Sequence, residues 1–159
     1  MTFDRMDYYF EKALEIYCEE SKKDSSQLIE KELEEVQYRA SNHIGFFLAW
    51  IIKNDFIGEI HRKLEEDGIE SAVDAVKNEK MSGTEFFLEQ CDGKFWDEDV
   101  SDEILPFVEK YYEDYFHEYV TWVIEDLGDL PMEFIGTWED YHQFEHILDE
   151  AYKEFCKSL

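Results

Sequence analysis

The sequence predicts an all-α protein, a single compact helical domain of about six to eight helices over residues 1–159. Apolar residues recur mostly three and four positions apart, which is the period of a helix face rather than of a strand. Strict alternation of apolar and polar residues, and clusters of Val and Thr, are almost absent. Helix-capping residues separate the apolar runs. The length fits one domain, and neither a repeat nor a linker divides it.

Two acidic amphipathic helices are expected in the N-terminal part of the chain. Apolar residues at helical spacing predict the first over residues 3–21. Asp24, Ser25 and Ser26 then offer capping oxygens for a second helix. The apolar face of this second helix consists of Leu28, Ile29, Leu33 and Val36.

The centre of the fold is expected over residues 43–53. The pattern changes near Asn42 from acidic and amphipathic to almost wholly apolar. The apolar run from His43 to Ile52 is shorter than the roughly 20 residues of a membrane-spanning helix. It suits a helix that is buried on most of its sides.

Two short helices and a capped one are expected next. Glycines punctuate the short helices, residues 58–66 and 69–78. Ser82-Gly83-Thr84-Glu85 matches the capping-box pattern and predicts a helix that ends at Gly93.

Two long helices complete the predicted fold. Pro106 stands where the first turn of a helix tolerates proline, and aromatic and apolar spacing extends this helix to Val123. A glycine and a proline then close it. Thr137 opens the last helix, which runs to about Cys156.

Charge is the most unusual property of the composition. The chain has 41 Asp and Glu against 15 Lys and Arg, a formal net charge of −26, yet it is 44% hydrophobic, enough for a packed core. A folded domain with this self-repulsion produces a strong field that attracts cations. Nucleic acid is disfavoured as a partner, because phosphate binding requires clustered Lys and Arg. We expect a basic protein partner; halophilic adaptation, the competing explanation, fits poorly with 12 lysines and 27 aromatic residues.

We expect a cytoplasmic protein that does not enter a membrane. No apolar run reaches the 18 or more residues of a spanning helix, and the first residues lack the basic and apolar regions of a signal peptide. Cys18, Cys91 and Cys156 show no CxxC spacing, so we expect buried free thiols rather than a disulfide framework or a zinc knuckle.

One face of the predicted last helix carries Glu139, His142 and His146 at a spacing that metal ligands use. With 41 acidic residues, a Glu three positions before a His is expected by chance. The HExxH motif, a GxSxG elbow and a glycine-rich phosphate loop are absent. We therefore expect no metal, no cofactor and no enzymatic activity. A metal-binding helical enzyme or sensor that uses His142 and His146 is the alternative.

Carboxylates and aromatic residues gather in the region from Phe95 to Tyr119. Aromatic anchors flanked by charge are typical of protein-binding surfaces. The competing interpretation places the tyrosines in the core and the acids on a solvated face. We predict that the partner-binding residues are Trp96, Asp97, Glu98, Asp99, Asp102, Glu103, Tyr112, Glu113 and Asp114. A lesser acidic candidate consists of Glu30, Glu32, Glu34 and Glu35.

Several stretches resemble a bacterial family of small helical proteins. The most specific is residues 43–50, His-Ile-Gly-Phe-Phe-Leu-Ala-Trp, which matches an HIGxFLAW motif; the others lie within residues 80–95 and 137–152. The resemblance covers residues 42–157, whereas residues 1–40 depart from the family pattern. Members of this family are seen among cytoplasmic immunity proteins encoded beside secreted or contact-delivered bacterial toxins.

The resemblance implies an immunity protein of a toxin–immunity system, such as contact-dependent growth inhibition, and implies no catalytic residue. Together with the charge, it leads us to expect a protein that inhibits a cognate basic nuclease toxin, with an RNase as the first expectation. The inhibitor would cover the toxin's nucleic-acid-binding cleft with an acidic surface. An acidic adaptor for another basic protein is the remaining alternative.

Overall fold

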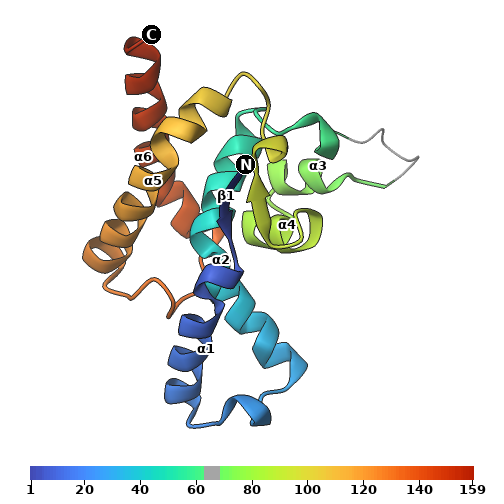
Figure 1. The fold of residues 1–159 in the computed structure, drawn as a ribbon, viewed down its shortest axis with the longest axis vertical. Coiled ribbons are helices and arrows are strands. Elements are labelled where there is room, and N and C mark those ends of the chain that lie inside the picture. The colour runs from blue at the N-terminus through green and yellow to red at the C-terminus, as the bar shows by residue number, and fades with distance from the viewer. Residues whose placement is uncertain (63–68) are drawn as a thin grey trace.

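The long helix α2 (Glu30–Lys53) lies at the centre of the molecule, and the other elements are arranged along it (Figure 1). The computed structural model describes residues 1–62 and 69–159. It confirms the predicted all-α class, with six α-helices and one pair of short strands in these residues. The remaining helices and strands are β1 (Thr2–Arg5), α1 (Asp7–Ser21), α3 (Ala72–Lys77), α4 (Gly83–Gln90), β2 (Lys94–Trp96), α5 (Leu105–Trp122) and α6 (Trp138–Lys157).

Helix α2 changes its surroundings along its length. Every residue from Ala40 to Ile52 is buried, as the apolar run predicted, whereas Glu30 and Lys31 in the first turn are exposed. The prediction of two separate helices in this region was wrong, because the chain stays helical from Glu30 to Lys53, through Ser41 and Asn42. The change near Asn42 is therefore one of burial and not of backbone conformation.

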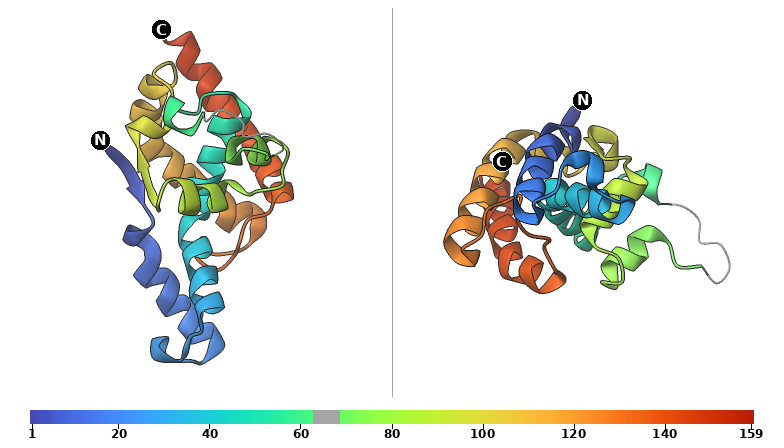
Figure 2. Two further views of the ribbon diagram at one scale, coloured as in Figure 1. Left: turned by 90° about the vertical axis from the view of Figure 1, so that its right-hand side faces the viewer. Right: turned by 90° about the horizontal axis from the view of Figure 1, so that it is seen from below.

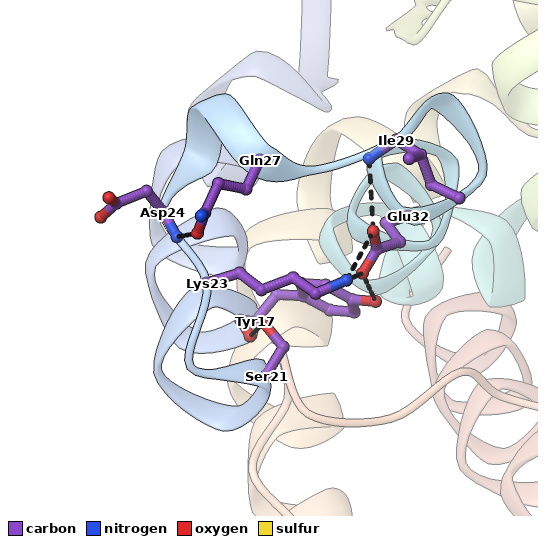
Figure 3. A network of polar contacts seen from close by, with 7 residues as sticks. All are labelled: Tyr17, Ser21, Lys23, Asp24, Gln27, Ile29 and Glu32. Atoms are coloured by element: carbon purple, nitrogen blue, oxygen red, sulfur yellow. Dashed lines mark hydrogen bonds and ion pairs between the residues drawn. The ribbon is translucent and has the colours of Figure 1, made fainter.

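The exposed half of α2 and α1 form a helical hairpin that projects from the body (Figures 1 and 2). Glu32 fixes the turn between them. Its carboxylate accepts hydrogen bonds from Ile29 N at 3.2 Å, Lys23 Nζ at 3.2 Å and Tyr17 Oη at 3.0 Å (Figure 3). The hairpin has a small apolar core of its own, formed by Ala13, Val36 and Ala40.

The first residues differ from the prediction. Thr2–Arg5 form strand β1, which pairs antiparallel with β2, and α1 begins at Asp7 rather than at residue 3. Tertiary pairing overrides the local helical spacing here. The Phe3 ring packs on Phe95 with 5.2 Å between ring centroids, and Asp4 is buried.

Three predicted helix starts are confirmed. The Ser82 hydroxyl accepts a hydrogen bond from Glu85 N at 3.0 Å and caps α4. Thr137 and Asp140 form a capping box at the start of α6. Pro106 lies in the first turn of α5, where its missing N–H costs no helical hydrogen bond.

The predicted short helices are shorter in the structure. The described part of the predicted helix 58–66 is a 3₁₀ turn, η2 (Glu59–His61), and residues 63–66 lie outside the described residues. The predicted helix 69–78 is α3. A further 3₁₀ turn, η3 (Asp97–Asp99), follows β2.

Helix α5 continues into a π-helical turn, η4 (Val123–Leu127). The turn ends at Gly128, whose φ of 69° lies in the left-handed region that favours glycine. Across the described residues, none of the helices has both the length and the apolar character needed to cross a membrane.

A buried polar cluster ties the N-terminal strand to α2 and α5. His43 Nε2 lies 3.0 Å from Asp4 Oδ2, and the two side chains are only 2% and 4% exposed. The Tyr112 hydroxyl donates to the same oxygen at 2.8 Å. Burial by itself raises the pKa of Asp4, but the hydrogen bond and charge of His43, with hydrogen bonds from Tyr112 and Tyr9, outweigh it and lower this pKa. The cluster therefore stabilises the fold with Asp4 ionised.

Replacing Asp4 by Asn should destabilise the protein by about 3 kcal/mol at neutral pH, because two buried partners lose a charged acceptor. The folded-state pKa of Asp4 is depressed, so its contribution is present above the unfolded pKa and is lost as the pH falls through the folded value. The difference in unfolding free energy between the wild type and Asp4→Asn should narrow below pH 3.8, the ordinary pKa of the group. Urea unfolding followed by circular dichroism at several pH values measures this difference in free energy. A difference that does not vary with pH would contradict the stabilising role of the ionised Asp4 carboxylate.

Helices α2 and α4 cross in direct backbone contact. A Cβ atom on Gly45 would lie 2.5 Å from Thr84 N and 2.6 Å from its Cα. A Cβ atom on Gly83 would meet the carbonyl of Gly45 and lie 3.0 Å from the Ala49 Cβ. Both helices need glycine at the crossing, because the close neighbours are mostly backbone atoms, which cannot move away as a flexible side chain can.

The substitution Gly45→Ala should therefore destabilise the fold by about 3 kcal/mol, the upper part of the usual range for overpacking a core. The midpoint of urea unfolding measures the effect. Lys31→Ala, at an exposed position of the same helix, is the control and should stay within about 0.5 kcal/mol of the wild type. Equal stability of the two variants would mean that the crossing relaxes without cost.

Candidate protein-binding surfaces

An open depression lies where η2 and η3 meet, and it contains part of the predicted partner-binding cluster. The carboxylates of Asp97, Glu98 and Asp102 line it, joined by Glu59 and by the apolar side chain of Ile60 from η2. We call it the η2/η3 depression; among the residues that the structure describes, no lysine or arginine lines it. Its lining therefore offers an acidic rim with an apolar element, which suits a cationic partner.

Backbone contacts hold the two loops of the η2/η3 depression together. Gly58 N donates to the carbonyl of Asp99 at 2.8 Å, and Ser101 N donates to the carbonyl of Phe56 at 2.7 Å. An isolated β-bridge joins the same two segments. The acidic side chains thus extend from a fixed backbone rather than from a free loop.

Two large apolar side chains near this depression are exposed. Trp96 is 43% exposed and Ile60 is 54% exposed. Trp96 ends β2 and directly precedes Asp97, so an exposed aromatic side chain stands beside the carboxylates. Asp102 and Glu103 are also exposed.

Two residues of the predicted cluster lie in the interior. Asp99 is 4% exposed, and its carboxylate accepts hydrogen bonds from Trp96 N at 2.8 Å and faces His61 Nε2 at 2.8 Å. Tyr112 is 8% exposed and bonds to Asp4. Both side chains hold the fold together. The competing interpretation was therefore right for Tyr112, whereas it placed Asp99 on a solvated face, and the structure buries it.

The last two residues of the predicted cluster, Glu113 and Asp114, are exposed on α5, one helical turn before a second acidic groove. This α5/α6 groove has an apolar floor of Trp122, Ile147 and Ala151. Its carboxylates are Glu118, Glu125, Asp126, Glu150 and Glu154.

The α6 side of the α5/α6 groove was not among the predicted surfaces. Glu150 and Glu154 are one turn apart on α6, and Ile147 and Ala151 repeat the same spacing, so the helical period alone places each pair on one face. The helical period does not predict that α5 packs opposite this face of α6.

A third acidic depression lies between α2 and α4 and involves the lesser predicted candidate. Glu30, Glu34 and Glu89 line it with Tyr38. Burial raises the pKa of Tyr38 to about 12, together with the charges of nearby glutamates. Burial and neighbouring glutamates also raise the pKa of Glu85. The crowding of carboxylates thus creates a strongly negative local potential.

Glu32 and Glu35 of that candidate are already engaged. Glu32 holds the α1–α2 turn (Figure 3), and Glu35 lies 3.2 Å from the Arg39 guanidinium. Many of the described cations are likewise paired with carboxylates. They are Arg5, Lys12, Lys23, Arg39, Lys53, Lys77, Lys80 and Lys157.

His142, one of the two helical histidines considered as metal ligands, is hydrogen-bonded to a carboxylate of another segment. His142 Nε2 lies 2.8 Å from Glu79 Oε1, and the hydrogen bond to this carboxylate raises the pKa of His142. Within residues 1–62 and 69–159, one group of three potential metal ligands lies close together, and α6 contributes none of them. Its members are His61, Cys91 and Asp99.

Together, the fold and these surfaces define an acidic, all-α protein with open, carboxylate-lined depressions. The chain belongs to the family described as domain of unknown function DUF7832, whose model matches residues 2–133. The match extends from β1 through α5 and ends before α6. No curated protein and no solved structure matches the chain significantly.

The two predicted aromatic anchors should respond differently to truncation. Tyr112→Ala should destabilise the protein by about 4 kcal/mol, because it empties a core site and removes a partner of Asp4. Trp96→Ala removes a half-exposed side chain and should cost about 1 kcal/mol or less. Urea unfolding of both variants checks this contrast. A larger loss for Trp96→Ala than for Tyr112→Ala would show that the assignment of core and surface is wrong.

Proposed function

We propose that this protein is an immunity protein that binds and inhibits a basic nuclease toxin, with ribonucleases as the first class to test. One observation carries the proposal: a net charge of −26 on a folded chain in which three open depressions are lined by carboxylates, with no lysine or arginine among the described lining residues. The resemblance of residues 42–157 to a family seen among immunity proteins supports the same function.

In the proposed mechanism, carboxylates take the place of nucleic-acid phosphates. A nuclease cleft is lined by Lys and Arg that bind phosphates. Asp97, Glu98 and Asp102 of the η2/η3 depression would pair with such cations, while Trp96 and Ile60 supply the apolar contact that slows dissociation. Occupation of the cleft excludes the nucleic acid, so the inhibitor needs no catalytic residue of its own.

The unbalanced charge contributes mainly to the rate of capture. Electrostatic steering raises protein association toward about 10⁸–10⁹ M⁻¹s⁻¹ at low salt. An inhibitor that must reach a toxin before it cleaves its substrate benefits directly from this rate. We place this activity in the cytoplasm, where the nucleic acids of the protected cell are.

The paired surface cations also favour a basic protein partner over nucleic acid. Phosphate binding needs free clustered cations, whereas Lys53 and Lys77 each lie near carboxylates of this chain. The other alternative, an acidic adaptor for a basic protein that is not a toxin, shares the same surface. It predicts binding without protection of a toxin-exposed cell.

The test uses the basic C-terminal domain of a toxin encoded beside the gene. A variant with Asp97→Lys, Glu98→Lys and Asp102→Lys should associate at least about tenfold more slowly at low salt, because steering depends on charge near the interface. The control is Glu11→Lys, Glu15→Lys and Glu19→Lys on α1, three exposed positions in the projecting hairpin, with the same change in net charge. Stopped-flow binding and inhibition of toxin nuclease activity are the measurements.

The two triple variants separate local from overall charge. Equal slowing of both would assign the effect to net charge and remove the η2/η3 depression as the interface. Wild-type protein that neither binds the adjacent toxin domain nor protects the cell from it would overturn the immunity function.

A further inference from the structure

Close in the chain to residues that line the η2/η3 depression, His61 and Asp99 converge with the partly buried thiol of Cys91. His61 Nε2 lies 2.8 Å from Asp99 Oδ1 and 3.9 Å from Cys91 Sγ. One ligand atom from each residue lies within 4.8 Å of those from the other two. The His61 and Asp99 side chains are 8% and 5% exposed, so this is not a set of surface acids.

Three separate segments place these side chains, and each is held by the backbone. His61 ends η2, and its ring lies edge-on to Phe86 with 5.0 Å between centroids. Cys91 caps the C-terminus of α4, where its N–H donates to the Phe87 carbonyl at 3.2 Å. The second oxygen of Asp99 accepts from Trp96 N at 2.8 Å, which orients the first toward His61.

The arrangement does not suit a Cys–His–Asp catalytic triad. A triad needs the imidazole between its partners, with one ring nitrogen facing each. Here Cys91 and Asp99 both approach the same nitrogen of His61, Nε2. Burial and the adjacent Asp99 also raise the pKa of the Cys91 thiol, which disfavours the thiolate that a nucleophile requires.

We propose that His61, Cys91 and Asp99 form a zinc-binding site. Thiolate, imidazole and carboxylate together are a ligand set that Zn²⁺ accepts, whereas Mg²⁺ and Ca²⁺ prefer oxygen alone. A tetrahedral ion with bonds of about 2.0–2.3 Å separates its N and O ligands by about 3.3 Å and its N and S ligands by about 3.6 Å. The observed distances of 2.8 and 3.9 Å differ from these by about 0.5 Å or less.

Zinc at this position would replace the thiol proton of Cys91, would need Nε2 of His61 without a proton, and would leave a fourth coordination position for water. The ion would join η2, the end of α4 and η3. Glu59 and Ile60 precede His61, and Asp97 and Glu98 precede Asp99, so the same ion would fix the floor of the η2/η3 depression. The zinc site stands without the proposed function, because its geometry does not involve a partner.

Cobalt(II) provides a direct test, because cobalt bonded to a thiolate shows a near-ultraviolet charge-transfer band that surface carboxylates cannot produce. The full-length reduced protein should develop this band at one equivalent of Co²⁺ and lose it when Zn²⁺ is added. Cys91→Ser should abolish the band, and His61→Gln and Asp99→Asn should weaken Co²⁺ affinity by at least about tenfold. Cys18→Ser, Cys156→Ser and His142→Ala are the matched controls and should bind as the wild type does.

Zinc should also raise the melting temperature of the wild type and of the three controls, and leave that of Cys91→Ser unchanged. Circular dichroism shows which variants keep the helical fold, and the wild-type titration stands even if a variant unfolds. Absence of the thiolate band in the reduced wild type would overturn the proposal. A band that survives in folded Cys91→Ser but disappears in Cys156→Ser or His142→Ala would overturn it as well.

Discussion

The fold depends on the burial of one helix on all of its sides. The stretch Ala40–Ile52 of α2 leaves no face for water, so each face requires a packed neighbour. Helix α4 approaches so closely at Gly45 that the two backbones touch, while α5 and α6 cover the opposite region with aromatic rings such as Tyr115 and Phe144. Apolar burial of this extent gives the driving force that a chain with 41 carboxylates needs, since their mutual repulsion favours the unfolded state.

Among the described residues, the two buried carboxylates, Asp4 and Asp99, each face a histidine. Asp4, His43 and Tyr112 satisfy one another and join β1 to α2 and α5, and His61 with Asp99 joins η2 to η3. Such groups are costly to bury alone, so each pair also specifies which segments meet. The His61–Asp99 pair therefore positions the two segments from which the surface carboxylates of the η2/η3 depression extend.

On the surface that the structure describes, unlike in the core, many carboxylates have no cationic partner. Many described lysines and arginines lie in ion pairs, while the depressions at η2/η3, α5/α6 and α2/α4 have carboxylates, and no lysine or arginine, among their described lining residues. This distribution costs stability through repulsion that a cationic partner would relieve. In the proposed function, the acidic surface that destabilises the free protein is the surface that binds the basic toxin. The proposed zinc site would hold together the loops at one of these depressions.

The sequence by itself determined the helical class, the buried stretch of α2 and the helix starts at Ser82 and Thr137, because spacing and capping act over a few residues. It also determined that carboxylates would dominate the surface. Only the tertiary structure decided that residues 2–5 form a strand and that Tyr112 and Asp99 lie inside, because these outcomes depend on partners far along the chain. The same holds for the meeting of His61 with Cys91 and Asp99: these residues belong to three segments, and only the packing of the loops around α2 and α4 brings them together.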